Sequence, residues 1–366
     1  MRNGIVAKWI EPMLETLEIH RFRGIEYLKL ENLARVNIFL GGNGAGKTSV
    51  LEAVSLAANP TAPVLLNTLG LWREMPHATA SQTDSLLSAF MDLDPTNNIE
   101  FDFQTAEGAQ SLIIEASRGL SVEHDAARAV PLPSTGANSP GNGLLGVRYR
   151  WETTGGLVVD SSLDLNPNGF VIRTPPGAPS GDGAFFVHTR RSTSAAETAS
   201  TLTNLYEHKQ QKAFVDGLCA VDPRLKNMVV GARQNLPVVL VDIGRSKLVP
   251  MNLLGDGFCR VALMLTGMFA AQAKIVCIDE IDSGLYATVM ESTWRSLAKF
   301  VGQQNRQIFC TTHNEEMLRH AVVAFEESPD GLRVFRIDRD DSDATSVQTF
   351  TYDEFADSLR AGLDVR

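Results

Sequence analysis

The segment 41–48 constrains the fold of this chain more than any other, because it reads Gly-Gly-Asn-Gly-Ala-Gly-Lys-Thr and matches G-x-x-x-x-G-K-T. An apolar, β-prone run precedes it at 36–40, and a helix-compatible run follows from residue 49. Between a strand and a helix, such glycines let backbone N–H groups turn toward phosphate oxygens at the positive end of the helix dipole. The alternative, a glycine-rich turn with an incidental Lys-Thr, is disfavoured by these flanking runs. The sequence therefore predicts a Walker A phosphate loop.

The residue types in this loop predict ATP and Mg²⁺ as its ligands. The Lys47 amine can reach the β- and γ-phosphates, where it also serves catalysis, and the Thr48 hydroxyl can ligate Mg²⁺. No Asn-Lys-x-Asp element is present, so guanine specificity is not expected. The predicted nucleotide-binding residues of this segment are Gly41, Asn43, Gly44, Ala45, Gly46, Lys47, Thr48 and Ser49.

Composition limits the partners. The 366 residues suffice for one large or two ordinary domains. Lys and Arg number 33 against 43 Asp and Glu, a net charge of −10, whereas a sequence-independent nucleic-acid binder is usually basic. DNA would therefore have to contact a local patch or a partner; the best basic pair in its stretch, Arg190-Arg191, is equally well explained as a solvated strand end. No apolar run is long enough for a membrane span, and four cysteines without a C-x-x-C pair fit a reducing cytoplasm.

Hydrophobic periodicity divides the chain into a strand-rich first half and an alternating second half. Segment 1–13 shows no secretion signal and is interpreted as a leader. Pro- and Gly-rich insertions at 130–144 and 165–183 are interpreted as loops. Strands are predicted at 15–20, 25–30, 35–40, 98–104, 110–116, 146–153, 156–163 and 237–243, with short helices at 62–95 and a helical pattern at 195–230.

The last third alternates between helix and strand, which predicts right-handed crossovers and a parallel sheet. Helices are expected at 256–272, 285–303 and 314–324, and strands at 274–279, 306–311 and 332–337. The strand at 332–337 is expected to be the last in the chain. Because the phosphate loop lies so far upstream of these strands, we expect a long insertion within one nucleotide-binding fold.

Two acidic residues close a buried strand at 274–280, which reads Lys-Ile-Val-Cys-Ile-Asp-Glu. An apolar strand that ends in two acids is common and weak by itself, but with a phosphate loop it predicts a Walker B motif. Asp279 would hold Mg²⁺ directly or through water, and Glu280 would orient and deprotonate the attacking water.

Two further segments fit the same site. His313 follows the strand 306–311, at the ligand edge of a parallel sheet, although a lone His is usually structural. The helix start Leu254-Gly255-Asp256-Gly257 offers a second anion-binding N-terminus, or is an ordinary helix cap. Two such sites exceed the need of one nucleotide, so Gly255, Asp256 and Gly257 are predicted to bind the γ-phosphate held by another subunit.

These motifs, in their order along the chain, resemble those of the ABC-type ATPase head shared by RecF, SMC proteins and the overcoming-lysogenization-defect (OLD) family. The likeness is carried by 17–25 (Leu-Glu-Ile-His-Arg-Phe-Arg-Gly-Ile), 36–41, 254–257, 278–285 and the closing Gly-Leu-Asp-Val-Arg at 362–366. The family roles transfer to Lys47, Thr48, Gly255, Asp279, Glu280 and His313. The departures are Gly-Asp-Gly for Ser-Gly-Gly, Tyr286 where this branch often has His, and a Q-loop glutamine that is not placed among Gln82, Gln104 and Gln110.

The resemblance implies an α/β P-loop NTPase of the ABC-ATPase type, with a mixed parallel sheet, helices and an N-terminal antiparallel β subdomain. Residues 14–366 would form one head, with lobe I at about 14–193 and lobe II at about 194–366. The chain shows no long coiled coil, and only about 30 residues follow the last predicted strand, too few for the nuclease domain of OLD nucleases.

The function implied is a slow, cytoplasmic ATPase switch. Two heads, or a higher even number, would close around ATP and control a separately encoded nuclease or toxin, as in PARIS- or Septu-like anti-phage systems. The alternatives are a RecF-like DNA repair or recombination clamp and a transporter ATPase subunit. The Pro-rich insertions and the ends of the chain argue against the transporter.

Overall fold

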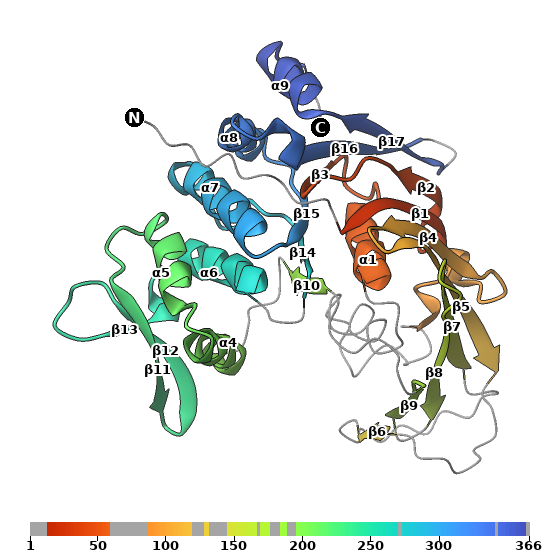
Figure 1. The fold of residues 1–366 in the computed structure, drawn as a ribbon, viewed down its shortest axis with the longest axis horizontal. Helices are drawn as coiled ribbons and strands as arrows, with labels where there is room; N and C mark the ends of the chain where they lie inside the picture. The colour runs from red at the N-terminus through yellow and green to blue at the C-terminus, as the bar shows by residue number, and fades with distance from the viewer. Residues whose placement is uncertain are drawn as a thin grey trace.

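The computed structural model describes residues 13–58, 86–118, 128–131, 145–166, 169–175, 184–188, 195–269, 273–340 and 343–363. Within these ranges two large sheets and a small third one account for the strands (Figure 1). No helix in the described part of the chain is long and apolar enough to cross a membrane.

The central sheet has six strands in the order β10-β14-β15-β3-β16-β17. All neighbours pair in parallel except β16 and β17, which are antiparallel. Every residue of β3, β14 and β15 is buried, as expected for parallel strands covered on both faces. The strands are β3 (Val36–Leu40), β10 (Ala184–Val187), β14 (Ile275–Ile278), β15 (Gln307–Thr311), β16 (Leu332–Arg339) and β17 (Thr345–Phe350).

The second sheet is antiparallel, with eight strands in the order β2-β1-β4-β5-β7-β8-β9-β6. In strand β1 the buried residues are Leu14, Leu17, Ile19 and Phe22 and the others are half-buried, as in a sheet with one face in a core. The strands are β1 (Leu14–Phe22), β2 (Ile25–Leu30), β4 (Ile99–Thr105), β5 (Gly108–Arg118), β6 (Arg128–Pro131), β7 (Leu145–Thr153), β8 (Val158–Asn166) and β9 (Gly169–Arg173).

Two hydrophobic cores lie on opposite faces of the central sheet. One joins the antiparallel sheet, helix α1 and residues such as Phe39 and Phe309. The other joins the remaining helices to residues such as Ile38 and Cys310. Figure 1 accordingly shows α1 and α6 on different sides of β14 and β15. The helices are α1 (Lys47–Ala58), α4 (Ala195–Glu207), α5 (Gln211–Cys219), α6 (Asp256–Phe269), α7 (Ala287–Gln303), α8 (Glu315–Phe325) and α9 (Tyr352–Arg360), with 3₁₀ turns at Met91–Leu93, Met251–Leu253 and Pro329–Gly331.

The predicted fold class, a mixed parallel sheet with helices and an N-terminal antiparallel sheet, is confirmed. The helical prediction for 195–230 is wrong at its end, where β11 (Asn227–Arg233) pairs with β12 (Leu236–Asp242), which pairs in turn with β13 (Val249–Pro250). The β11–β12 connection is Gln234-Asn235, and both residues have positive φ, +50° and +62°. This is the backbone of a type I′ hairpin turn, whose sequence signal here is weak because no Gly is present.

Three other expectations need correction. The insertion 165–183 is not all loop, because its Phe-Val-Ile run forms β9 against β8. The insertion 130–144 begins inside β6, which pairs with β9. The strand at 332–337 is not the last, since β17 and α9 follow it. Residues 1–12, 59–85, 132–144 and 176–183, with Gln82 and Arg190-Arg191, lie outside the described residues, so most of the predicted 62–95 helices stay predictions.

Candidate functional site

The predicted site residues follow strands that lie side by side. The phosphate loop follows β3, Asp279 and Glu280 follow β14, and His313 comes two residues after β15. The strands β14, β15 and β3 are consecutive in the sheet and parallel, with Ile278 opposite Cys310 and Thr311 opposite Phe39. Because parallel strands end at one edge, segments more than 230 residues apart in the sequence meet there, as Thr48 and Asp279 do.

The phosphate loop is held in shape by the backbone of Gly41. This residue has φ of +135°, and a Cβ added to it would lie 2.0 Å from the carbonyl oxygen of Ile337 on the neighbouring strand β16. Gly44 and Gly46 also have positive φ. The first glycine of the motif is therefore required by packing against β16, in addition to any contact with phosphate.

Replacing Gly41 with Ala is expected to lower the free energy of unfolding by about 3 kcal/mol, because the methyl group overlaps the Ile337 carbonyl and the backbone angle disfavours an L side chain. Urea unfolding of the nucleotide-free protein measures this loss. The matched control is Gly42→Ala, where an added Cβ meets nothing within 4 Å, so the change should stay below about 1 kcal/mol. Equal stability of the two variants would contradict this packing role.

Lys47 folds back over its own loop. Its Nζ donates hydrogen bonds to the carbonyl oxygens of Gly41 at 2.9 Å and Gly42 at 2.7 Å. Burial lowers the pKa of Lys47, and the nearby charges of Asp279 and Glu280 oppose that shift. The amine is thus pre-placed beside the glycine backbone where phosphate oxygens would enter.

Asp279 lies between two hydroxyl groups. Thr48 Oγ1 donates toward its carboxylate oxygens at 3.3 and 3.4 Å, and Thr311 Oγ1 donates to its Oδ1 at 2.8 Å. Among the described residues no cluster of three or more His, Cys, Asp or Glu could enclose a metal. One carboxylate beside one hydroxyl at a phosphate loop nevertheless fits Mg²⁺, which takes few protein ligands and completes its shell with phosphate and water.

Glu280 has a constrained backbone. Its φ is +48°, in the left-handed region that a non-glycine residue rarely adopts. Its amide donates to Thr311 Oγ1 at 2.7 Å, and its carbonyl oxygen accepts from the amide of Ser283 at 2.9 Å. Strain of this kind persists only where surrounding contacts hold it, and it is frequent at functional sites.

His313 reaches the same edge. Partial burial and the Lys47 charge lower its pKa, while Glu280, Asp282 and Asp279 act in the opposite direction. The net lowering of the pKa favours a neutral imidazole near pH 7, in which one ring nitrogen donates a hydrogen bond and the other accepts one. The segment is fixed by Thr312 Oγ1, which donates to Asp282, and by Asn314, which caps α8.

Helix α6, which begins in the segment 254–257, packs on the other face of the sheet from α1 (Figure 1), and among the described residues no hydrogen bond joins this segment to Lys47, Thr48 or Asp279. Gly255 is exposed, has φ of +99°, and has open space around its Cβ position. A Cβ on Gly257 would lie 2.8 Å from the carbonyl oxygen of Gly284. Two residues after Gly284, Tyr286 is 82% exposed.

The two described candidates for a Q-loop glutamine lie in the antiparallel sheet. Gln104 Nε2 donates to the carbonyl of Thr105, and Gln110 Oε1 accepts from Trp151 Nε1 at 2.9 Å. Within the described part of the chain, neither makes a hydrogen bond to Lys47, Thr48 or Asp279. The structure therefore gives no support to either one.

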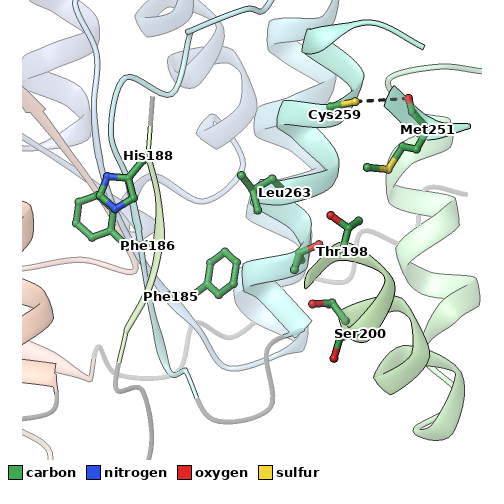
Figure 2. Close-up of a pocket in the computed structure, with 10 residues that line it drawn as sticks. Phe185, Phe186, His188, Thr198, Ser200, Met251, Cys259 and Leu263 are labelled. Carbon is green, nitrogen blue, oxygen red and sulfur yellow. Dashed lines mark hydrogen bonds between the residues drawn. The ribbon is translucent and has the colours of Figure 1, made fainter. Parts of the chain in front are cut away.

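A cavity of about 320 Å³ lies between β10, α4 and α6. Figure 2 shows Phe185 and Leu263 directed into it, and Cys259 on α6 donates to the Met251 carbonyl at 3.5 Å. Of the described residues that line it, none is among the predicted nucleotide-binding residues. The cavity is therefore separate from the phosphate-loop edge.

Sequence reasoning missed two residues of the site. Thr311 contacts both the Asp279 carboxylate and the Glu280 amide, and the guanidinium of Arg260 contacts the backbone of Asp279 and Glu280. A signal existed for each. Thr311 is a polar residue at the end of a buried strand, and Arg260 is the only basic residue of the apolar helix α6.

The parallel sheet, the loop 41–48 after β3 and the acidic pair after β14 give the chain the fold of a P-loop NTPase of the ABC type. In agreement, residues 159–319 match the family described as "AAA domain, putative AbiEii toxin, Type IV TA system", and residues 12–87 match a protein family of unknown function, DUF2813.

Individual proteins resemble the chain to different extents. An ATP/GTP phosphatase of Helicobacter pylori is 20% identical over 353 residues, which cover 90% of this chain and 93% of that protein. The DNA replication and repair protein RecF of Cellvibrio japonicus is 44% identical over 45 residues, 12% of each chain. A solved SMC head bound to the C-winged helix domain of ScpA is 12% identical with a TM-score of 0.48, covering 93% of this chain and 98% of that one.

Proposed function

We propose that this protein is a cytoplasmic, Mg²⁺-dependent ATPase that hydrolyses ATP slowly. The observation that carries the proposal is the meeting of Lys47, Thr48 and Asp279 at one sheet edge, with Thr48 Oγ1 3.3 Å from the Asp279 carboxylate. The full-length similarity to a protein named as an ATP/GTP phosphatase supports it. Nucleotide-dependent release of phosphate by the purified protein, with and without Mg²⁺, tests it.

Each residue has one task in this proposal. The backbone of residues 41–49 and the Lys47 amine would hold the phosphates, while Thr48 and Asp279 would hold Mg²⁺, which would neutralise charge on the phosphate oxygens. Glu280 accepts the proton of the attacking water, and His313 contacts the γ-phosphate as a neutral donor. The leaving group is the ADP β-phosphate oxygen.

The segment 255–257 completes the site of a second copy. Since α6 and α1 pack on different faces of the sheet, the segment serves nucleotide held by another subunit, in a dimer or a larger even-numbered oligomer. The exposed Gly255, the N-terminus of α6 and the exposed side chains of Leu253 (69%) and Tyr286 (82%) support a contact surface here.

Gly255→Asp is expected to reduce ATP hydrolysis by about 100-fold while ATP binding persists, because a carboxylate then faces the γ-phosphate of the other subunit. Gly255→Asn is the matched control: it has the same shape, tolerates positive φ, and lacks the charge. Gly257 is a poorer test site, since a side chain there collides with Gly284. Turnover and equilibrium ATP binding are compared for both variants. Normal hydrolysis by Gly255→Asp would exclude the composite site.

The ATP-bound pair is proposed to control a separately encoded nuclease or toxin in anti-phage defence. The match to a family described as a putative toxin of a type IV toxin–antitoxin system supports a place in such a system, although that description names the matched domain itself as the toxin. Co-purification with the products of flanking genes, followed by mass measurement with and without ATP, tests it. Failure of all flanking products to associate in either state would contradict it.

A RecF-like DNA clamp is the second candidate, favoured by the short matches to RecF at 44–52% identity. A DNA titration at two salt concentrations separates the candidates. A clamp should bind DNA with ATP and lose affinity steeply with salt, whereas an acidic switch of net charge −10 should bind weakly at both.

A further inference from the structure

Arg260 connects helix α6 to the end of strand β14. Its Nη2 donates to the carbonyl oxygens of Asp279 at 2.6 Å and Glu280 at 3.3 Å, and its Nη1 donates to the carbonyl oxygen of His188, just after β10. One guanidinium therefore joins the helix to two strand ends. The planar fork of Arg can donate in several directions at once, which Lys cannot do in the same geometry.

These contacts hold the backbone of Glu280 from one side, and Thr311 holds it from the other. The Glu280 amide donates to Thr311 Oγ1, while its carbonyl accepts from Arg260 and Ser283. Its φ of +48° costs energy that these partners must offset. These backbone partners thus set the direction in which the Glu280 side chain leaves the backbone.

The same helix contacts the other end of this loop. Gly257, about one turn before Arg260, packs so closely on Gly284 that a Cβ would lie 2.8 Å from the Gly284 carbonyl oxygen. Helix α6 therefore holds the loop 279–284 at both ends, and its exposed start carries Gly255 and Asp256. A displacement of α6 would therefore also displace the backbone of Glu280.

We propose that Arg260 is a positioning residue that sets the backbone of Glu280 and transmits the position of helix α6 to it. This role rests on the proposed ATPase function and deepens it. When a γ-phosphate binds at the start of α6, the shift of the helix would move the general base, Glu280, of the same subunit. Burial lowers the pKa of Arg260, and the charges of Asp279, Glu280 and Asp282 oppose the loss of its proton, so the side chain stays cationic.

The test compares Arg260→Gln and Arg260→Lys with a matched control, Arg306→Gln. Arg306 Nε donates to the Met268 carbonyl at 3.0 Å, so it holds the opposite end of the same helix. We expect turnover to fall about 10- to 100-fold in both Arg260 variants, because small misplacements of a catalytic group cost about 100-fold. ATP affinity should change less than about 3-fold, since Arg260 does not contact the phosphate loop. Arg306→Gln should lower the free energy of unfolding without lowering turnover relative to ATP affinity.

Two further measurements separate positioning from general stability. In a Glu280→Gln background, Arg260→Lys should cause no additional loss of single-turnover rate, because the group it positions has already been removed. Amide hydrogen exchange of 279–285 should rise in the Arg260 variants and not in Arg306→Gln. The proposal would be overturned if Arg260→Lys slowed the Glu280→Gln variant by the same factor as it slows the wild type. Unchanged amide exchange of 279–285 in the Arg260 variants would also overturn it. The exchange result stands even if the wild type proves not to hydrolyse ATP, and if Arg260→Gln does not fold, Arg260→Lys carries the test.

Discussion

Replacing Glu280 with Gln is expected to slow ATP hydrolysis by about 100- to 10,000-fold, the usual contribution of a general base. The amide keeps the shape of the side chain and can hydrogen-bond water, but it cannot take up a proton. The backbone contacts of residue 280 to Thr311, Ser283 and Arg260 involve no side-chain atom of Glu280, so they persist in the variant. Phosphate release in single and multiple turnover measures the loss.

ATP binding should be unchanged in this variant, because Lys47, Thr48 and Asp279 are intact. ATP should therefore accumulate on the protein, and a nucleotide-dependent partner complex should stay in one state. Glu316→Gln, an exposed change of the same charge in the first turn of α8, is the control and should hydrolyse ATP normally. Unchanged hydrolysis in Glu280→Gln would remove Glu280 from the role of base.

Lys47→Ala is expected to weaken ATP binding by more than about 100-fold, or about 2.7 kcal/mol, because the cation that faces the β- and γ-phosphates is lost. The nucleotide-free protein should keep its stability within about 1 kcal/mol. Two hydrogen bonds to Gly41 and Gly42 disappear, but so does the unfavourable burial of a charge, which already lowers the pKa of this amine.

Calorimetric titration with ATP measures this affinity. Lys299→Ala, an exposed residue on α7, makes the same change of net charge away from the loop and should leave the affinity unaltered. If Lys47→Ala binds ATP as tightly as the wild type, residues 41–48 are not a phosphate loop.

Much of the fold could be predicted because its sequence patterns are local. The apolar runs of β3, β14 and β15 mark buried parallel strands, and the acids and His after them mark the carboxyl edge. The hairpin of β11 and β12 was not predicted, because its turn uses Gln234-Asn235 in a backbone that usually signals itself with Gly. Strand β9 was obscured by the Pro-rich residues around its apolar run.

The candidate site was predictable in its residues and not in its connections. Lys47, Thr48, Asp279 and His313 each belong to a segment with its own pattern, and topology then brings those segments to one edge. Arg260 and Thr311 stand out as polar residues in apolar elements, but no local pattern encodes their contacts with the backbone of Asp279 and Glu280, which lie 19 and 31 residues away in the pairs Arg260–Asp279 and Thr311–Glu280. The packing of Gly41 on Ile337 likewise depends on β16 lying beside β3.

We propose that ATP is held between two copies of the chain, with the phosphate loop of one copy facing the 255–257 segment of the other. The most direct test is the mass of Glu280→Gln in solution by light scattering, with and without ATP. ATP should double the mass of this variant, and adding Gly255→Asp to it should keep the lower mass while ATP still binds. Adding Gly255→Asn should leave the ATP-dependent doubling in place. Bound ATP with no change in mass, or the same doubling in the presence of Gly255→Asp, would show that ATP is not held between the 41–48 loop of one copy and the 255–257 segment of the other.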